Sequence, residues 1–162
     1  MKKKIINFSD IEEIVKIQKK KGKKIVHCHG VFDLLHIGHL KHFWSAKKKG
    51  DILIVSVTPD KFVSKGFNRP YFNSEQRAES LASVEVIDFV VINNSTNSVD
   101  IIHKIKPDFY CKGPDYKDFK KDITGQIKNE QLAVKRNGGK IIYTSDQIYS
   151  SSSIINQVGV KL

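Results

Sequence analysis

The chain has 162 residues, of which 40% are hydrophobic and 28% are charged, with 10 glycines and 4 prolines. These values fit one globular domain and exclude a disordered chain or a fibrous repeat. The formal charge of +11 concentrates anions near the surface, so nucleic acid, an acidic membrane and phosphorylated small molecules are candidate partners.

The first predicted element is a helix over 9–20, which opens with a capping box at Ser9 and continues with apolar residues at helical spacing. Gly22 ends this helix, and residues 24–28 are predicted to form the first core strand. The loop 29–33 leads to a second helix over 37–49. Residues 52–57 are mostly β-branched and carry no charge, which indicates a strand buried on both faces.

The remaining chain repeats this alternation. Helices are predicted over 74–83 with Ser74 as cap, 98–104, 123–137 and 152–158, and strands over 89–92, 109–111 and 141–143. The pattern is typical of an α/β fold, a Rossmann-like single domain with a five-stranded parallel sheet covered by helices on both faces. It spans 1–162, with a lead-in helix in 1–22 and a core over 23–158. Ligands of such sheets bind beyond the carboxyl ends of the strands.

Neither a leader peptide nor a membrane span is expected. The basic N-terminus has an apolar stretch of only two residues, and no run approaches the roughly 18 apolar residues that cross a bilayer. Cys28 and Cys111 lie far apart, each in an apolar run, which predicts buried, inert thiols and no disulfide framework. We therefore expect a cytoplasmic protein.

The loop after the first strand carries a pair of histidines. His36 and His39 face one way if they lie on the first turn of a helix, and the glycine between them lets a ligand approach the backbone. Free N–H groups at the helix N-terminus favour an anion, such as a triphosphate. A His-x-x-His pair also occurs in metal sites, but no third ligand stands at a convincing spacing. Asp33 is better placed to cap the helix.

The residues Gly30-Val31-Phe32-Asp33, followed by His36-Ile37-Gly38-His39, resemble the signature of the cytidylyltransferase-like nucleotidyltransferases. Residues 65–70, 73–77, 84–91, 106–108, 112–116 and 149–156 are similar to the adenylyltransferase domain that makes ADP-activated heptose for lipopolysaccharide. The resemblance covers residues 10–158 and implies an enzyme, a nucleotidyltransferase. It would transfer a nucleoside monophosphate, with AMP favoured, from a nucleoside triphosphate to a sugar phosphate such as heptose 1-phosphate, and release pyrophosphate.

The resemblance also implies roles for single residues. His36, His39 and Lys65 would be catalytic, the histidines by donating hydrogen bonds to the triphosphate and the lysine by neutralising phosphate charge. The nucleotide would be bound by Gly30, Val31, Phe32, Gly38, Lys41, Lys112, Gly113, Asp115, Ser150, Ser151 and Ser152. Asp33, Asp60 and Arg77 would face the acceptor or a phosphate. No residue is expected to ligate a metal, because Mg²⁺ would be held mainly through the triphosphate.

Structural roles compete with some of these assignments. Arg77 could form an ion pair instead, with Asp88 as a candidate partner. Lys41 and Asp60 could be ordinary surface residues, and the serine run 150–152 could only cap a helix.

Two departures from the heptose pattern bear on the nucleotide. Pro114 stands where the heptose family commonly has glycine, and proline cannot donate a backbone hydrogen bond there. The arginine that cytidylyltransferases place just before the last segment is missing, which favours ATP over CTP.

Three alternatives remain open. The nearest is a CTP-dependent cytidylyltransferase acting on a polyol or alcohol phosphate such as glycerol 3-phosphate. A non-catalytic nucleotide-binding module is opposed by the paired histidines with Lys65, and a nucleic-acid binder rests on charge alone. We therefore expect a nucleoside triphosphate and a phosphorylated small-molecule acceptor as partners, without nucleic acid or membrane, and a homodimer by analogy with the family.

Overall fold

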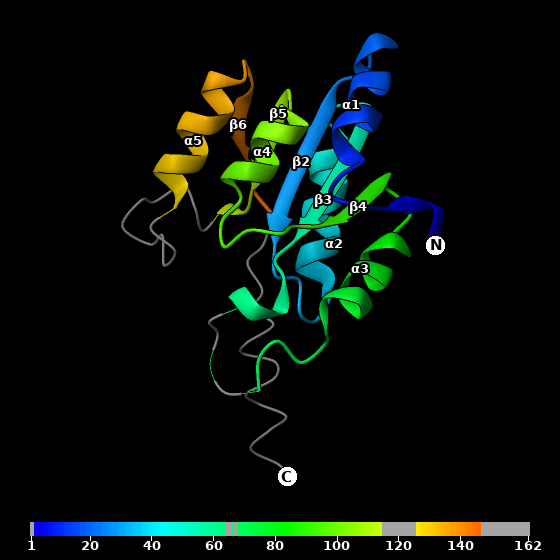
Figure 1. The fold of residues 1–162 in the computed structure, drawn as a ribbon, viewed down its shortest axis with the longest axis vertical. Coiled ribbons are helices and arrows are strands. Elements are labelled where there is room, and N and C mark those ends of the chain that lie inside the picture. The colour runs from blue at the N-terminus through cyan, green and yellow to red at the C-terminus, as the bar shows by residue number, and fades with distance from the viewer. Residues whose placement is uncertain (1, 64–65, 67, 115–125, 147–162) are drawn as a thin grey trace.

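The computed structural model describes residues 2–63, 66, 68–114 and 126–146. They form one parallel sheet with helices on both sides (Figure 1). The strands, in the spatial order β1-β4-β3-β2-β5-β6, are β1 (Ile5–Ile6), β2 (Ile25–Gly30), β3 (Ile52–Val57), β4 (Phe89–Ile92), β5 (Phe109–Lys112) and β6 (Lys140–Tyr143). The helices are α1 (Ile11–Lys20), α2 (Ile37–Lys47), α3 (Ser74–Ala82), α4 (Val99–Ile105) and α5 (Ile127–Arg136), with 3-10 turns η1 (Lys2–Lys4) and η2 (Asp60–Phe62). The predicted Rossmann-like α/β fold is confirmed.

Within the described residues, the sheet contains one strand more than the five that were predicted. β1 has only two residues, Ile5 and Ile6, which pair in parallel with Val90 and Val91 of β4 at the edge of the sheet. Two residues are too few to show a hydrophobic period. Tertiary contact with β4, and not a local sequence signal, therefore makes this segment a strand.

The predicted caps of α1 and α3 are wrong. Asp10, not Ser9, is the N-cap of α1, and the Ser9 hydroxyl donates to the Asp10 carboxylate and forms no capping hydrogen bond. The N-cap of α3 is Asn73, which forms a reciprocal capping box with Gln76, one residue before the predicted Ser74. At both places two neighbouring polar residues can cap, and the path of the preceding backbone decides between them.

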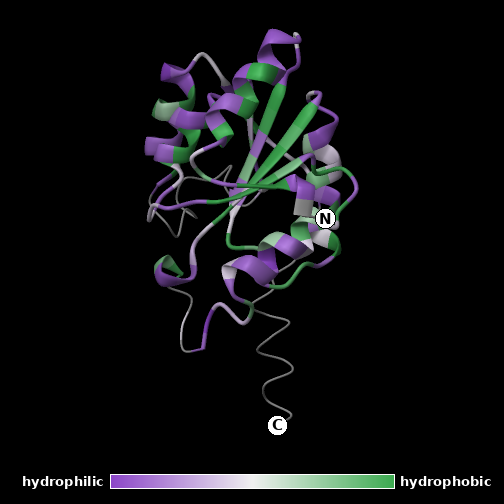
Figure 2. Ribbon diagram, turned by 45° about the vertical axis from the view of Figure 1, so that its right-hand side comes forward, coloured by the Kyte–Doolittle hydropathy of each residue, from purple (hydrophilic) through white to green (hydrophobic). Residues whose placement is uncertain are grey.

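Successive side chains of the strands point to opposite faces of the sheet and pack there in separate apolar clusters. On β3, Leu53 and Val55 pack in the cluster that contains residues of α2 and α3, whereas Ile54 packs with residues of α1 and α4. Figure 2 shows the apolar strands in the interior and polar residues on the outer sides of the helices. Among the described helices, none is long and apolar enough to cross a membrane.

The strand order reverses beside β2. The chain passes from β2 to β3 on one side and later crosses from β4 to β5 on the other. In open parallel sheets, ligands bind beyond the carboxyl ends of the strands at such a switch point. Gly30 ends β2 and Lys112 ends β5. The segment 31–36 between β2 and α2, here called the histidine loop, and Gly113 therefore leave the sheet side by side at this position.

The two cysteines lie on these same central strands. Cys28 and Cys111 occupy paired positions on β2 and β5, and both are buried free thiols. Burial raises the pKa of the Cys28 thiol well above its ordinary value. The prediction of buried thiols is confirmed.

Candidate functional site

The loop after β2 begins with an unusual backbone conformation. Phe32 has φ 51°, the left-handed region, which costs a residue other than glycine about 1–2 kcal/mol. Phe32 is 9% exposed, and its ring packs against His39 and Phe43, with ring centroids 5.3 and 5.2 Å away. A Cβ on Gly30 would lie 2.9 Å from this ring, so any other residue there would displace the ring. Ring burial therefore holds the strained turn that leads to the histidines.

His36 and His39 come together at the N-terminus of α2. Their rings are stacked, with centroids 3.9 Å apart and planes inclined by 17°. His36 is the N-cap of the helix, and its Nδ1 accepts a hydrogen bond from the His39 backbone N–H at 3.4 Å. The expectation that Asp33 caps this helix is therefore wrong.

The hydrogen bond at Nδ1 defines what His36 can offer to a ligand. Burial lowers the pKa of His36, and a backbone hydrogen bond acts in the opposite direction without cancelling this effect. The ring is therefore neutral near pH 7, and because Nδ1 is an acceptor, the proton is assigned to Nε2. A neutral Nε2–H at a helix N-terminus is a donor for negative charge on phosphate oxygens.

Arg77 packs against the histidine loop and is only 1% exposed. One terminal nitrogen donates to the Val31 carbonyl. The other donates to the Thr58 carbonyl at 2.7 Å and to the Asp60 carboxylate at 2.6 Å, and Nε donates to the Phe72 carbonyl at 3.0 Å. The structure thus directs this guanidinium toward the protein, where it joins the histidine loop to η2 and to the start of α3.

The acidic partner of Arg77 is not the one suggested by the sequence. Asp88 pairs with Lys47 and accepts a hydrogen bond from the Leu53 N–H, so the suggested pair of Arg77 with Asp88 is wrong. Asp60 pairs with Arg77 instead, and its second oxygen accepts from the backbone N–H of Ser74 in the first turn of α3 at 3.0 Å. Asp60 was predicted to face an acceptor or a phosphate, and both of its oxygens have protein partners.

Asp33 is likewise engaged, and it is 4% exposed. One oxygen accepts from Arg69 Nε at 2.8 Å, and the other accepts from the backbone N–H groups of Tyr71 and Phe72 at 2.8 and 3.1 Å. Asp33 therefore fastens the segment 69–72 to the histidine loop.

Lys112, predicted to contact the nucleotide, is 6% exposed, and its ammonium lies 2.7 Å from Glu130 of α5. Glu130 also accepts from the hydroxyls of Ser98 and Tyr110. Burial alone would raise the pKa of Glu130, but the charge of Lys112 and the hydrogen bonds lower it below its ordinary value. Glu130 was not predicted as a site residue. Its position three residues after the apolar Ile127 places both on one face of the helix, and this spacing was a usable signal that Glu130 faces the interior.

The other predicted site residues are less informative. Lys41 is exposed on α2, Gly38 lies between the two histidines in its first turn, and Gly113 follows β5. Lys65, Asp115, Ser150, Ser151 and Ser152 lie outside the described residues.

A chain of polar side chains lies beneath the site, between β2 and β3. The Ser56 hydroxyl contacts His27 Nε2 at 2.8 Å and His29 Nδ1 at 2.7 Å, and Thr58 Oγ1 lies 3.3 Å from His29 Nε2. Burial, then the charge of Lys112, lowers the pKa of His29 to about 4. His27 was not singled out from the sequence because it lies in a predicted strand, where a satisfied core residue is the ordinary interpretation. His29 was assigned to the loop 29–33, whereas the structure places it in β2.

Buried neutral histidines should make the fold sensitive to mild acid. Burial also lowers the pKa of His42, on α2, to about 4. In an unfolded chain histidine titrates near 6.5, so between pH 6.5 and 4 the unfolded state binds more protons and stability falls as the pH falls. We expect His29 and His42 each to remove about 2 kcal/mol of the free energy of unfolding between pH 7 and 5. Urea unfolding followed by circular dichroism measures this, and equal free energies at the two pH values would contradict it.

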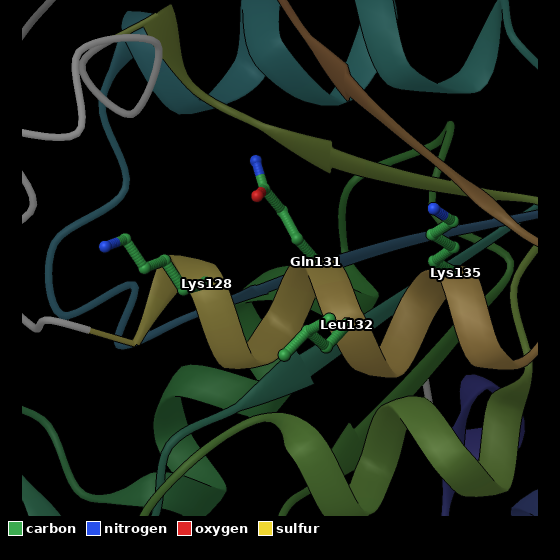
Figure 3. A pocket seen from close by; sticks show the side chains of 4 residues that line it. All are labelled: Lys128, Gln131, Leu132 and Lys135. Atoms are coloured by element: carbon green, nitrogen blue, oxygen red, sulfur yellow. The ribbon is translucent and has the colours of Figure 1, made fainter.

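A surface hollow of about 490 Å³ lies over α5 and is lined by Lys128, Gln131, Leu132 and Lys135 (Figure 3). The Gln131 amide donates to the Tyr143 hydroxyl at 3.2 Å, which ties this side of α5 to β6. The hollow shares no lining residue with the histidine loop. We therefore place the candidate site at the loop and not here.

The chain was compared with known protein families and proteins. A family model described as cytidylyltransferase-like matches residues 27–158. The bifunctional protein HldE of Sulfurimonas denitrificans is 46% identical over 114 residues, which are 69% of this chain and 24% of that protein. The bifunctional protein HldE of Aliarcobacter butzleri is 41% identical over 139 residues, 84% of this chain and 29% of that protein. The chain thus spans less than a third of the length of these relatives.

Solved structures show the same fold. The lipopolysaccharide core biosynthesis protein from Thermoplasma volcanium superposes with a TM-score of 0.65 at 26% identity, covering 78% of this chain and 100% of that chain. Pantoate-beta-alanine ligase from Francisella tularensis superposes with a TM-score of 0.60, covering 94% of this chain and 73% of that chain. At 18% identity, the second similarity shows the fold alone.

Proposed function

The chain belongs to the cytidylyltransferase-like family, and from this premise we propose that it transfers a nucleoside monophosphate, preferably AMP, from a nucleoside triphosphate to a sugar phosphate such as heptose 1-phosphate. The observation that carries the proposal is the stacked pair His36 and His39 at the N-terminus of α2, beside the switch point of the sheet. The similarity to a lipopolysaccharide core biosynthesis protein supports a sugar phosphate as the acceptor.

In the proposed reaction, an oxygen of the acceptor phosphate attacks the α-phosphorus of the triphosphate in line. A new P–O bond forms as the bond to the bridging oxygen breaks, and pyrophosphate leaves with the electron pair. Because the acceptor oxygen is already a nucleophile, the protein needs no activated serine or cysteine. Its part is alignment of the two phosphates and hydrogen bonding to the developing charge, from His36 Nε2–H and the N–H groups that begin α2.

We also propose that Mg²⁺ arrives with the nucleotide and is bound mainly through the triphosphate. Asp33 and Asp60, the carboxylates that contact the histidine loop or its support, are occupied by Arg69 and Arg77. Within the described part of the chain, no group of three or more His, Cys, Asp or Glu side chains is placed to hold a metal. When bound, the ion would neutralise charge on the leaving phosphates.

A cytidylyltransferase acting on a polyol phosphate is the second candidate, favoured by the family model itself. It would use the same loop and the same in-line attack, with CTP as donor and glycerol 3-phosphate as an example of the acceptor. The choice between ATP and CTP depends on recognition of the base. Among the described side chains of β5, Lys112 does not decide it, because its ammonium is paired with Glu130.

The test is pyrophosphate release with ATP, CTP, GTP and UTP, each combined with heptose 1-phosphate, other sugar 1-phosphates and glycerol 3-phosphate. We expect release with ATP and a sugar 1-phosphate. Release only with CTP and glycerol 3-phosphate would transfer the chain to the second candidate. Nucleotide binding without release in any combination, at enzyme concentrations that detect one turnover, would contradict the proposed activity.

A further inference from the structure

Arginine is rare in this lysine-rich chain. It occurs three times among 28 lysines and arginines, at positions 69, 77 and 136. Arg136 is exposed at the end of α5, whereas Arg69 and Arg77 are both buried against the histidine loop. A guanidinium differs from an ammonium in its rigid fork of donors, which matches two acceptor atoms at once. The acceptors of the two buried guanidinium groups therefore indicate what each arginine does.

The two forks are used differently. Both terminal nitrogens of Arg77 and its Nε donate to protein oxygens. Arg69 is 7% exposed at its side chain, and its Nε donates to Asp33 at 2.8 Å. Its Nη2 is also buried, yet it donates to no atom of the described residues. A buried N–H group left without an acceptor is rare in native proteins, so Nη2 calls for an acceptor that the described residues do not supply.

The position of Arg69 indicates what this acceptor is. Its guanidinium is held against Asp33, two residues after Val31 and three before His36, in the loop that begins the candidate site. The Asp33 carboxylate has accepted the Nε–H and two backbone N–H groups, so it fixes the orientation of the guanidinium plane. A guanidinium fixed in this way has a second edge suited to a phosphoryl oxygen.

We propose that Arg69 is a phosphate-binding residue of this site. Nη2 donates to an oxygen of a bound phosphoryl group while Nε remains on Asp33, which acts as its positioning residue. This inference rests on the proposed function and adds a residue to which no role was assigned from the sequence. The phosphoryl group belongs either to the nucleoside triphosphate or to the acceptor, and the two sources are separated by the choice of probe.

Calorimetric titration gives the decisive comparison. Mg-ATP, inorganic pyrophosphate and glucose 1-phosphate are titrated into the wild type, Arg69→Lys and Arg69→Gln, with Arg136→Lys as the matched control. We expect both Arg69 variants to raise the Kd about tenfold for the ligand whose phosphate is bound, because lysine restores the charge but not the fork. Weaker binding of Mg-ATP and pyrophosphate assigns the triphosphate, and weaker binding of glucose 1-phosphate alone assigns the acceptor.

A purely structural ion pair makes a different prediction. In that case Arg69→Lys and Asp33→Asn lower the Tm together, and every Kd stays within twofold of the wild type, which would overturn the proposal. Wild-type protein that binds none of the three probes would overturn it as well. Binding that depends on Arg69 without pyrophosphate release would support the proposal while the proposed function fails.

A measurement on the wild-type protein tests the proposal even if the Arg69 variants do not fold. With three arginines in the chain, the Nε–H resonances in a ¹H–¹⁵N spectrum can be assigned one by one. The Arg69 resonance should shift on saturation with the ligand identified by calorimetry, or with Mg-ATP if no variant folds, and the Arg136 resonance should not. An Arg69 resonance that does not move with any of the three probes would contradict the proposal.

Discussion

Replacing His36 with asparagine is expected to lower kcat/KM for pyrophosphate release by about 10²–10³-fold, the usual effect of losing one donor to a developing negative charge. The free energy of unfolding should stay close to that of the wild type. Asparagine is among the best N-cap residues, so it can replace the acceptor that His36 Nδ1 offers to the His39 N–H. It cannot place a donor where Nε2 lies on the stacked ring.

The comparison with His36→Ala separates the two roles of this residue. Alanine removes both the cap and the donor, so it should lose the same activity and, in addition, about 1 kcal/mol of stability. His103→Asn, at an exposed position of α4, is the matched control and should keep both properties. If His36→Asn retained wild-type kcat/KM, the histidine would be only a helix cap and the proposed chemistry would have to be assigned elsewhere.

Replacing Arg77 with methionine is expected to lower the free energy of unfolding by about 3 kcal/mol or more. Methionine has a similar length and fits a buried position, but it leaves the carbonyls of Val31, Thr58 and Phe72 without this donor. It also removes the ion pair of Asp60. Urea unfolding at pH 7 measures the change.

The control for this prediction is Arg136→Met, at an exposed position of α5, which should change stability by less than about 0.5 kcal/mol. A loss below about 1 kcal/mol in Arg77→Met would mean that the residue behaves as a surface ion pair. That result would restore the interpretation in which Arg77 faces the substrate, and binding of Mg-ATP to the variant would then be the next measurement.

Most of the sheet could be predicted from the sequence. The strand at 52–57 is apolar except for Ser56 and mostly β-branched, and a segment of this composition has few places other than the centre of a parallel sheet. The helix that carries the histidines was predicted from a glycine-bounded segment after a strand. The two-residue strand at Ile5 was not predictable, because its pairing with Val90 is decided by β4 and not by its own residues.

The partners of the charged residues could not be predicted in the same way. An aspartate that is near an arginine in sequence competes for its guanidinium with carboxylates and backbone carbonyls that are distant along the chain. Arg77 bonds to Thr58 and Val31, and Lys112 bonds to Glu130, across separations of 19, 46 and 18 residues. Such pairs are selected by how the strands and helices pack, which no local pattern encodes.

The sequence by itself determined the α/β class and the position of the histidine pair, because hydrophobic period and residue spacing are local properties of the chain. It also determined the family, through a motif whose residues are contiguous. Only the tertiary structure decided what surrounds that motif: the stacking of His36 on His39, the neutral state that burial favours for His36, and the occupation of Asp33 and Asp60 by arginines. These depend on burial and on distances between remote segments, and both arise only when the sheet and its helices pack together.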